Sequence, residues 1–230
     1  MAVEAIREAA RVMDIDMREA TVAVVGATGA IGKTCAEMLA GESAKLILVG
    51  RRVEPLEELR DLCAGKAADV AISTSMDAIY DADLILTVTS AVHEVIQPQH
   101  LKPGAVVCDV ARPRDVSKRV AAERDDVLVI EGGMIEIPGQ PDFHFDFGFP
   151  PRHAYACMAE TMALALEQRY EDYTIGKDIT VAQALEIGEI ADRHGFRLSG
   201  FRSFEQPVTA EQIAAVRERA ADHRKTWARV

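Results

Sequence analysis

The sequence lacks the long apolar run that a membrane-spanning helix requires. No stretch of its 230 residues approaches the roughly 18 consecutive apolar side chains of such a helix. Charges recur throughout residues 1–16, which is not the pattern of a secretory signal peptide. Basic residues are also few, since 26 Lys and Arg face 37 Asp and Glu, a formal net charge of −11. We therefore expect a cytoplasmic protein without a membrane span, and the charge argues against nucleic acid as a partner.

Cysteine is sparse, and its spacing matches no metal-binding pattern. The four cysteines are far apart and form no CxxC pair: Cys35, Cys63, Cys108 and Cys157. We expect them to be reduced thiols. The polar residues that could be assembled into a metal site also lack any ligand spacing: His93, His100, His144, Asp142 and Asp146. We therefore predict no metal site.

What the sequence does contain is an alternation of apolar runs and helical patterns. Six continuous apolar runs predict strands covered on both faces, at residues 21–26, 45–50, 69–73, 83–90, 104–110 and 126–133. Helical spacing predicts a helix over 2–13 and further helices after the first two strands. The part beyond residue 150 reads as helices without strands between them. The predicted fold class is α/β, with a doubly wound, mostly parallel Rossmann-type sheet in residues 1–150 and a helical C-terminal region over 151–230.

A glycine-rich string, GATGAIGKT, follows the first predicted strand and opens a helix. In this context the first glycine allows a tight turn, the second lets a pyrophosphate approach, and the third lets helix and strand pack closely. The free N–H groups of the helix N-terminus attract phosphate. The predicted cofactor-binding residues are Gly26, Ala27, Thr28, Gly29, Ala30, Ile31 and Gly32. A Walker A loop is the rival interpretation, but Ala27 stands where that motif needs its first glycine.

The end of the second predicted strand distinguishes between the two nicotinamide dinucleotides. Binding of NAD usually requires an acidic residue there, on the ribose 2′-OH. This sequence has Arg51 and Arg52 instead, and two guanidinium groups suit a 2′-phosphate. We therefore predict NADP(H) as the cofactor, the alternative being a pair of solvated surface arginines.

Polar residues after the later strands are further candidates for contacts to the cofactor. The fourth and fifth strands of a doubly wound sheet end beside the crevice in which the nicotinamide lies. The candidates are Thr87, Thr89, Ser90 and Asp109, with the backbone of Gly132 and Gly133 as possible donors to an oxyanion. Loop capping is the alternative for each of these side chains. Arg112 and Arg114 with Asp115 could bind an anionic substrate or pair with each other.

Several of these stretches resemble known families. TVAVVGATGAIG, ADLILTVTSA and CDVARPRDV resemble the NADPH-binding domain of shikimate dehydrogenases and glutamyl-tRNA reductases. IDMREATVAVVGATGAIG, EGGMIE, YACMAETM and ITVAQALEIGEIADRHGF resemble, in the same order, the long-chain acyl-[acyl-carrier-protein] reductases. The segment between EGGMIE and YACM differs from that family, as does the sequence from SGFRSFEQ onward. That family carries a substrate-binding lobe before this domain, whereas this sequence begins just ahead of the first predicted strand.

The resemblance to the acyl reductases implies a chemistry. It implies that Cys157 takes up an acyl group as a thioester, which NADPH then reduces. Spacing adds His153, four residues earlier, as an activating base if both lie on one helix, and Glu160 matches the glutamate of the motif. The alternative is that Cys157 is a small buried core residue. Tyr173 and Lys177 have the spacing of short-chain dehydrogenases, but we interpret this as coincidence because Gly176 ends the helix.

The predicted function is an NADPH-dependent reduction of an activated acyl group to an aldehyde. The alternatives are a shikimate-dehydrogenase-like alcohol dehydrogenase without a covalent step and a non-catalytic NADP(H)-binding subunit or sensor. We expect a small-molecule or carrier-bound acyl substrate. The apolar face of the last helix, which carries Ile213, Val216 and Ala220, suggests a homodimer, and a separate substrate-binding partner is a second possibility.

Overall fold

The chain forms two units, which are described separately. A computed structural model describes residues 1–66, 69–146, 148–176 and 178–227. The sheet unit comprises Ala2–Gly132 and Phe201–Val230, and the helical unit comprises Met1 and Gly133–Gly200. The chain thus leaves the sheet unit after Gly132, earlier than the predicted boundary at residue 150, and it returns at Phe201. No helix in the described part of the chain has both the length and the apolarity needed to cross a bilayer.

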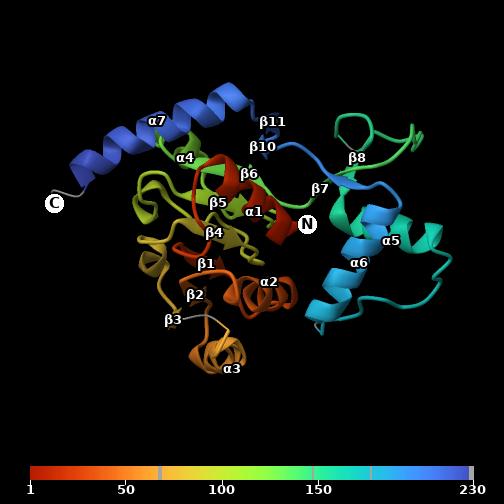
Figure 1. The fold of residues 1–230 in the computed structure, drawn as a ribbon, viewed down its shortest axis with the longest axis horizontal. Helices are drawn as coiled ribbons and strands as arrows, with labels where there is room; N and C mark the ends of the chain where they lie inside the picture. The colour runs from red at the N-terminus through yellow and green to blue at the C-terminus, as the bar shows by residue number, and fades with distance from the viewer. Residues whose placement is uncertain (67–68, 147, 177, 228–230) are drawn as a thin grey trace. The chain divides into compact units, whose positions relative to one another are not determined.

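The sheet unit contains the predicted doubly wound parallel sheet (Figure 1). Its strands are β1 (Thr21–Val25), β2 (Lys45–Val49), β3 (Asp69–Ser73), β4 (Leu84–Thr87), β5 (Val106–Asp109) and β6 (Leu128–Glu131). They are ordered β3-β2-β1-β4-β5-β6, and every neighbouring pair is parallel. This order reverses direction at the β1–β4 pair, and in such sheets the ligand crevice lies outside the carboxyl ends of those two strands.

Both faces of the sheet are buried, because side chains alternate along each strand and helices cover both sides. Val25, Val49 and Val107 belong to a core shared with η1 (Met76–Ile79), α4 (Lys118–Glu123) and the residues on either side of η2 (Pro98–His100). The opposite face packs against α1 (Ala2–Val12) and α2 (Ala30–Ala40). α1 is amphipathic and buries Val3, Ile6 and Ala10, while α3 (Val53–Cys63) packs beside β3.

The C-terminal segment of the sheet unit adds a hairpin and a long helix. The hairpin consists of β10 (Arg202–Ser203) and β11 (Gln206–Pro207), and α7 (Ala210–Trp227) follows on the β6 side of the sheet (Figure 1). Ion pairs join Arg217 of α7 to Asp14 and Arg219 to Asp125, and Ala220 is 2% exposed. The apolar face of α7 therefore packs partly on its own unit, and the predicted homodimer stays a prediction.

The helical unit is less purely helical than the sequence predicts. A three-stranded antiparallel sheet, ordered β8-β7-β9, is formed by β7 (Met134–Glu136), β8 (His153–Tyr155) and β9 (Arg197–Leu198). It packs with α5 (Ala156–Leu166) and α6 (Val181–Arg193) around a core that includes Ile135, Ala163 and Phe196. The expectation of helices without intervening strands was wrong here, because strands of two or three residues leave no periodic signal.

Candidate functional site

The glycine turn after β1 has the geometry that its sequence predicts. Gly26 has φ +80°, and a Cβ on it would lie 2.7 Å from the carbonyl oxygen of Val88. A Cβ on Gly32 would lie 2.3 Å from the carbonyl oxygen of Gly26. The N–H groups of Gly26 and Ala27 both donate to the carbonyl oxygen of Val49, at 2.9 and 3.1 Å. The first glycine is therefore required by the packing of the turn against the segment after β4, and the third by the packing of the turn itself.

The second glycine leaves space for a ligand. A Cβ on Gly29 would meet only the carbonyl oxygen of Gly26, at 3.4 Å, so the turn is open at that point. Gly29 is the N-cap of α2, which begins without a capping side chain and without an acidic residue in its first turn. The first-turn N–H groups of a helix have no intrahelical partner and carry a partial positive charge. The backbone of residues 29–32 thus fits a pyrophosphate, while Thr28 and Ile31 border the same turn.

Arg51 and Arg52 lie next to this turn. They follow β2 directly, two and three residues after the Val49 carbonyl that accepts the hydrogen bonds of the turn. Both are exposed, and within the described residues neither has a hydrogen bond or an ion pair to another side chain. Exposed guanidinium groups of this kind can bind a phosphate, so the role of Arg51 and Arg52 in cofactor binding stays a prediction.

The candidates after β4 and β5 lie on the same edge of the sheet, but most of their polar atoms are already bonded. The hydroxyl groups of Thr87 and Thr89 both donate to the carboxylate of Asp115. Asp109 is 1% exposed, and its carboxylate accepts hydrogen bonds from the N–H groups of Ala111 and Val116, at 3.0 and 3.1 Å. Burial raises the pKa of Asp109 to about 6, and the nearby charge of Asp115 adds to this effect. Their bonding matches loop capping more closely than cofactor contact, whereas Ser90 is exposed.

A charged cluster that the sequence did not predict lies at the end of β6. The side chain of Glu131 is 5% exposed and pairs with Arg114 at 2.6 Å, while Arg112 lies 3.6 Å away. The N–H of Glu205 also donates to it, at 2.7 Å, so the returning C-terminal segment is attached here. Burial opposes the charge of Glu131, but these partners hold its pKa below the usual range. Arg114 thus pairs with Glu131 and not with Asp115.

Gly132 does not fit the role of an oxyanion donor. Its N–H already donates to the carbonyl oxygen of Asp109, at 3.0 Å, and a Cβ there would lie 2.7 Å from the sulfur of Cys108. This glycine serves the packing of β5 against β6. Gly133 has φ +95°, and its carbonyl oxygen accepts a hydrogen bond from Ala156 at the start of α5.

Cys157 is the one exposed cysteine, the other three being buried. Burial raises the pKa of the Cys35 thiol to about 11 and that of the Cys108 thiol still further, and it also raises the pKa of Cys63. Cys157 is the second residue of α5, a helix that has neither a capping side chain nor an acidic residue in its first turn. The partial positive charge at such a helix start favours negative charge on a side chain. Its exposure argues against the buried-core alternative.

The residues proposed to assist Cys157 are placed differently from expectation. His153 lies in β8 and not on a helix, so the argument from helical spacing was wrong. Its Nδ1 lies 2.8 Å from the carbonyl oxygen of Pro151. Glu160 does lie one turn after Cys157 on α5, but its carboxylate accepts a hydrogen bond from the Thr174 hydroxyl, at 2.6 Å. The Tyr173 hydroxyl donates to Glu186, and Lys177 lies outside the described residues.

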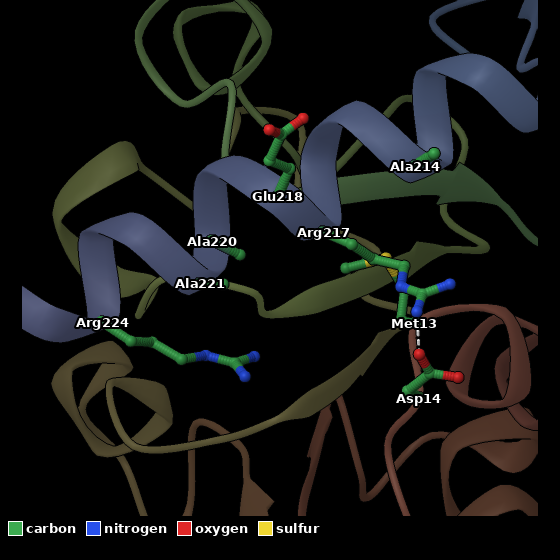
Figure 2. Close-up of a pocket in the computed structure, with 8 residues that line it drawn as sticks. All are labelled: Met13, Asp14, Ala214, Arg217, Glu218, Ala220, Ala221 and Arg224. Carbon is green, nitrogen blue, oxygen red and sulfur yellow. Dashed lines mark hydrogen bonds and ion pairs between the residues drawn. The ribbon is translucent and has the colours of Figure 1, made fainter.

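In the sheet unit, a depression of about 520 Å³ lies between α7 and the end of α1 (Figure 2). It is at the end of the sheet opposite to the glycine turn. It includes Asp14, which is ion-paired with Arg217, and Arg224, whose Nε donates to the carbonyl oxygen of Pro103 just before β5. The amino ends of the strands face this region, so it is not part of the crevice at the glycine turn.

The chain is similar in sequence to a known family and to curated proteins. The family model of shikimate / quinate 5-dehydrogenase matches residues 7–131. The chain is 33% identical over 201 residues to the long-chain acyl-[acyl-carrier-protein] reductase of Synechococcus elongatus, covering 84% of this chain and 57% of that protein. It is 29% identical over 208 residues to the aminotransferase PigE of a Serratia species, covering 87% of this chain and 24% of that protein. The chain thus spans only part of the length of these relatives.

Two solved structures have a similar arrangement. Glutamyl-tRNA reductase from Methanopyrus kandleri matches with a TM-score of 0.47 and 19% identity, covering 96% of this chain and 44% of that one. Shikimate 5-dehydrogenase from Listeria monocytogenes matches with a TM-score of 0.44 and 14% identity, covering 56% of this chain and 51% of that one. The strand order of the sheet confirms the predicted fold class, and the family model and the 33% identical relative confirm the predicted resemblance and support a nucleotide-binding domain for NADP(H).

Proposed function

The chain belongs to the shikimate / quinate 5-dehydrogenase family of NAD(P)-dependent oxidoreductases, and from this premise we propose that it reduces activated acyl groups to aldehydes with NADPH. The glycine turn would hold the pyrophosphate of the cofactor, and Arg51 and Arg52 its 2′-phosphate. Bound NADPH supplies the hydride of the reaction. The residues of this chain bind the dinucleotide and carry the acyl group.

The proposed covalent step takes place at Cys157. Its thiolate sulfur forms a bond to the carbonyl carbon of a thioester, and the bond to the carrier sulfur breaks. The carrier leaves as a thiolate, which takes up a proton from solvent. The acyl group is then a thioester of Cys157, and its reduction returns the Cys157 thiolate and releases the aldehyde.

The observation that carries this proposal is the position of Cys157. It is exposed at the uncapped start of α5, whereas Cys35, Cys63 and Cys108 are buried thiols with raised pKa values. Exposure gives a large thioester access to the sulfur, which the three buried thiols do not offer. The similarity to a long-chain acyl-[acyl-carrier-protein] reductase supports the same chemistry.

Steady-state kinetics with a matched pair of variants test the proposal. We expect the full chain to oxidise NADPH when given an acyl thioester of coenzyme A, and to release the aldehyde. Cys157→Ala should abolish aldehyde formation without changing NADPH affinity. Leu166→Ala, an exposed position at the far end of α5, should leave the rate unchanged.

The two alternatives predict other outcomes. An alcohol dehydrogenase without a covalent step would oxidise a hydroxy acid with NADP⁺ at the same rate in Cys157→Ala. A non-catalytic subunit or sensor would bind NADPH and turn over neither substrate. We also propose that the protein is a homodimer and that a separate partner binds the substrate. Light scattering of the full chain measures its mass and so tests the homodimer.

A further inference from the structure

A buried carboxylate lies behind the loop that follows β4. Asp115 has no exposed surface, and within the described residues no Lys, Arg or His pairs with it. Its charge is met by three donors from two residues. These are the Thr87 hydroxyl at 2.5 Å, the Thr89 N–H at 2.8 Å and the Thr89 hydroxyl. An ion buried in this way is costly unless its hydrogen bonds are complete, so its partners are held in place.

The bond to the Thr89 N–H fixes the orientation of one peptide group. In a planar trans peptide the N–H and the preceding C=O point in opposite directions. Since the Thr89 N–H points at Asp115, the Val88 carbonyl points away from it. That carbonyl oxygen is the atom that a Cβ on Gly26 would approach to 2.7 Å. The Val88–Thr89 peptide is therefore clamped between Asp115 and the first glycine of the phosphate turn.

The main chain of Asp115 holds the other end of the same loop. Its carbonyl oxygen accepts hydrogen bonds from the N–H groups of Val95 and Ile96, at 2.8 and 3.0 Å. One residue thus closes the base of the loop over residues 88–96. A substitution of Asp115 would release only the Thr89 end of the loop, because the main-chain hydrogen bonds of Val95 and Ile96 to residue 115 remain.

The loop over residues 88–96 lies at the edge of the sheet where doubly wound folds bind a dinucleotide. β1 and β4 are neighbours at the point where the strand order reverses, and a dinucleotide binds outside their carboxyl ends. The glycine turn follows β1, and this loop follows β4. We infer that Asp115 is a positioning residue that holds the β4 loop against the glycine turn and so shapes the nicotinamide half of the dinucleotide crevice. Thr87 and Thr89 then act through Asp115 and not by touching the cofactor. The inference rests on the NADP(H) binding of the proposed function.

Binding of two ligands distinguishes an effect on the nicotinamide half of the crevice from an effect on the adenosine half. NADPH fills both halves, whereas adenosine 2′,5′-bisphosphate lacks the nicotinamide half. We expect Asp115→Ala to weaken NADPH binding about three- to tenfold, because a loosened loop must be ordered on binding. The affinity for adenosine 2′,5′-bisphosphate should stay within about twofold of the parent. Asp115→Asn should recover most of the loss, because its amide can still accept the Thr89 N–H.

Asp126 provides the matched control. It is 2% exposed and precedes β6 at the other end of the sheet, where it pairs with Arg124 and His223. Asp126→Ala should lower Tm but leave the ratio of the two affinities at the parent value. If Asp115→Ala does not fold, Thr89→Ala is measured in its place, with the same ratio expected to fall. An unchanged ratio in the folded variant overturns the inference, whereas a parent that fails to bind NADPH overturns the cofactor assignment instead.

Discussion

The preference for NADPH over NADH should depend on Arg51 and Arg52. Both side chains are exposed beside the glycine turn, where a 2′-phosphate would make charge-assisted hydrogen bonds to them. Such bonds contribute about 1.5–3 kcal/mol each when shielded from water. Exposure and screening by salt reduce this, so we expect Arg51→Ala plus Arg52→Ala to cost about 1–3 kcal/mol in total. This corresponds to a loss of about 5- to 150-fold in NADPH affinity.

The assay is a titration followed by nicotinamide fluorescence, with NADPH and NADH on the parent and the double variant. The affinity for NADH should hardly change, because it lacks the 2′-phosphate. Arg11→Ala plus Arg18→Ala removes the same charge at the amino ends of the strands and should leave both affinities unchanged. Added salt should reduce the preference of the parent protein for NADPH over NADH. Equal affinities of the parent for the two cofactors would refute the reasoning.

Three further predictions follow from the packing, the buried carboxylate and the thiols. Gly32→Ala should lower the free energy of unfolding by about 1–3 kcal/mol in a urea titration, because its Cβ would collide with the Gly26 carbonyl oxygen. Unchanged stability would contradict the close packing of residue 32 against that carbonyl group. The pKa of Asp109 is raised from 3.8 to about 6, so its stabilising contribution is present below pH 3.8 and is lost as the pH rises through 6. Relative to the parent, Asp109→Asn should therefore gain up to about 3 kcal/mol in the free energy of unfolding between pH 4 and pH 7 in denaturant titrations, and a pH-independent difference would show that folding does not raise the pKa of Asp109. A short iodoacetamide pulse at neutral pH should label Cys157 first and Cys108 last, as judged by mass spectrometry, and a protected Cys157 in the folded protein would restore the buried-core alternative.

The parts of the fold that the sequence predicts are those with local signals. The six strands are apolar runs bounded by turns, and the glycine turn is recognisable because its three glycines, the preceding strand and the following helix are contiguous. Gly32 needs no long-range information, since its contacts lie within the turn, whereas the close contact of Gly26 is with Val88 after β4 and is not local.

The parts that the sequence did not predict depend on contacts between distant segments. β7, β8 and β9 have two or three residues each, and β9 pairs with β7 from about 60 positions further along the chain. His153 precedes an apolar helical pattern without any capping residue, so nothing in the sequence marks the end of the strand before α5. The bonding of Thr87 and Thr89 to Asp115 joins residues 26 and 28 positions apart, and it has no sequence signature.

The most direct test of the central claim is the trapping of an acyl group on Cys157. The full chain is incubated with an acyl thioester of coenzyme A without NADPH, and the masses of the intact protein and of the tryptic peptide over residues 153–169 are measured. The account predicts one added acyl group on that peptide, absent in Cys157→Ala and removed when NADPH is added to the parent. Protein that binds NADPH but acquires no acyl group, or acquires it equally in Cys157→Ala, would contradict the account.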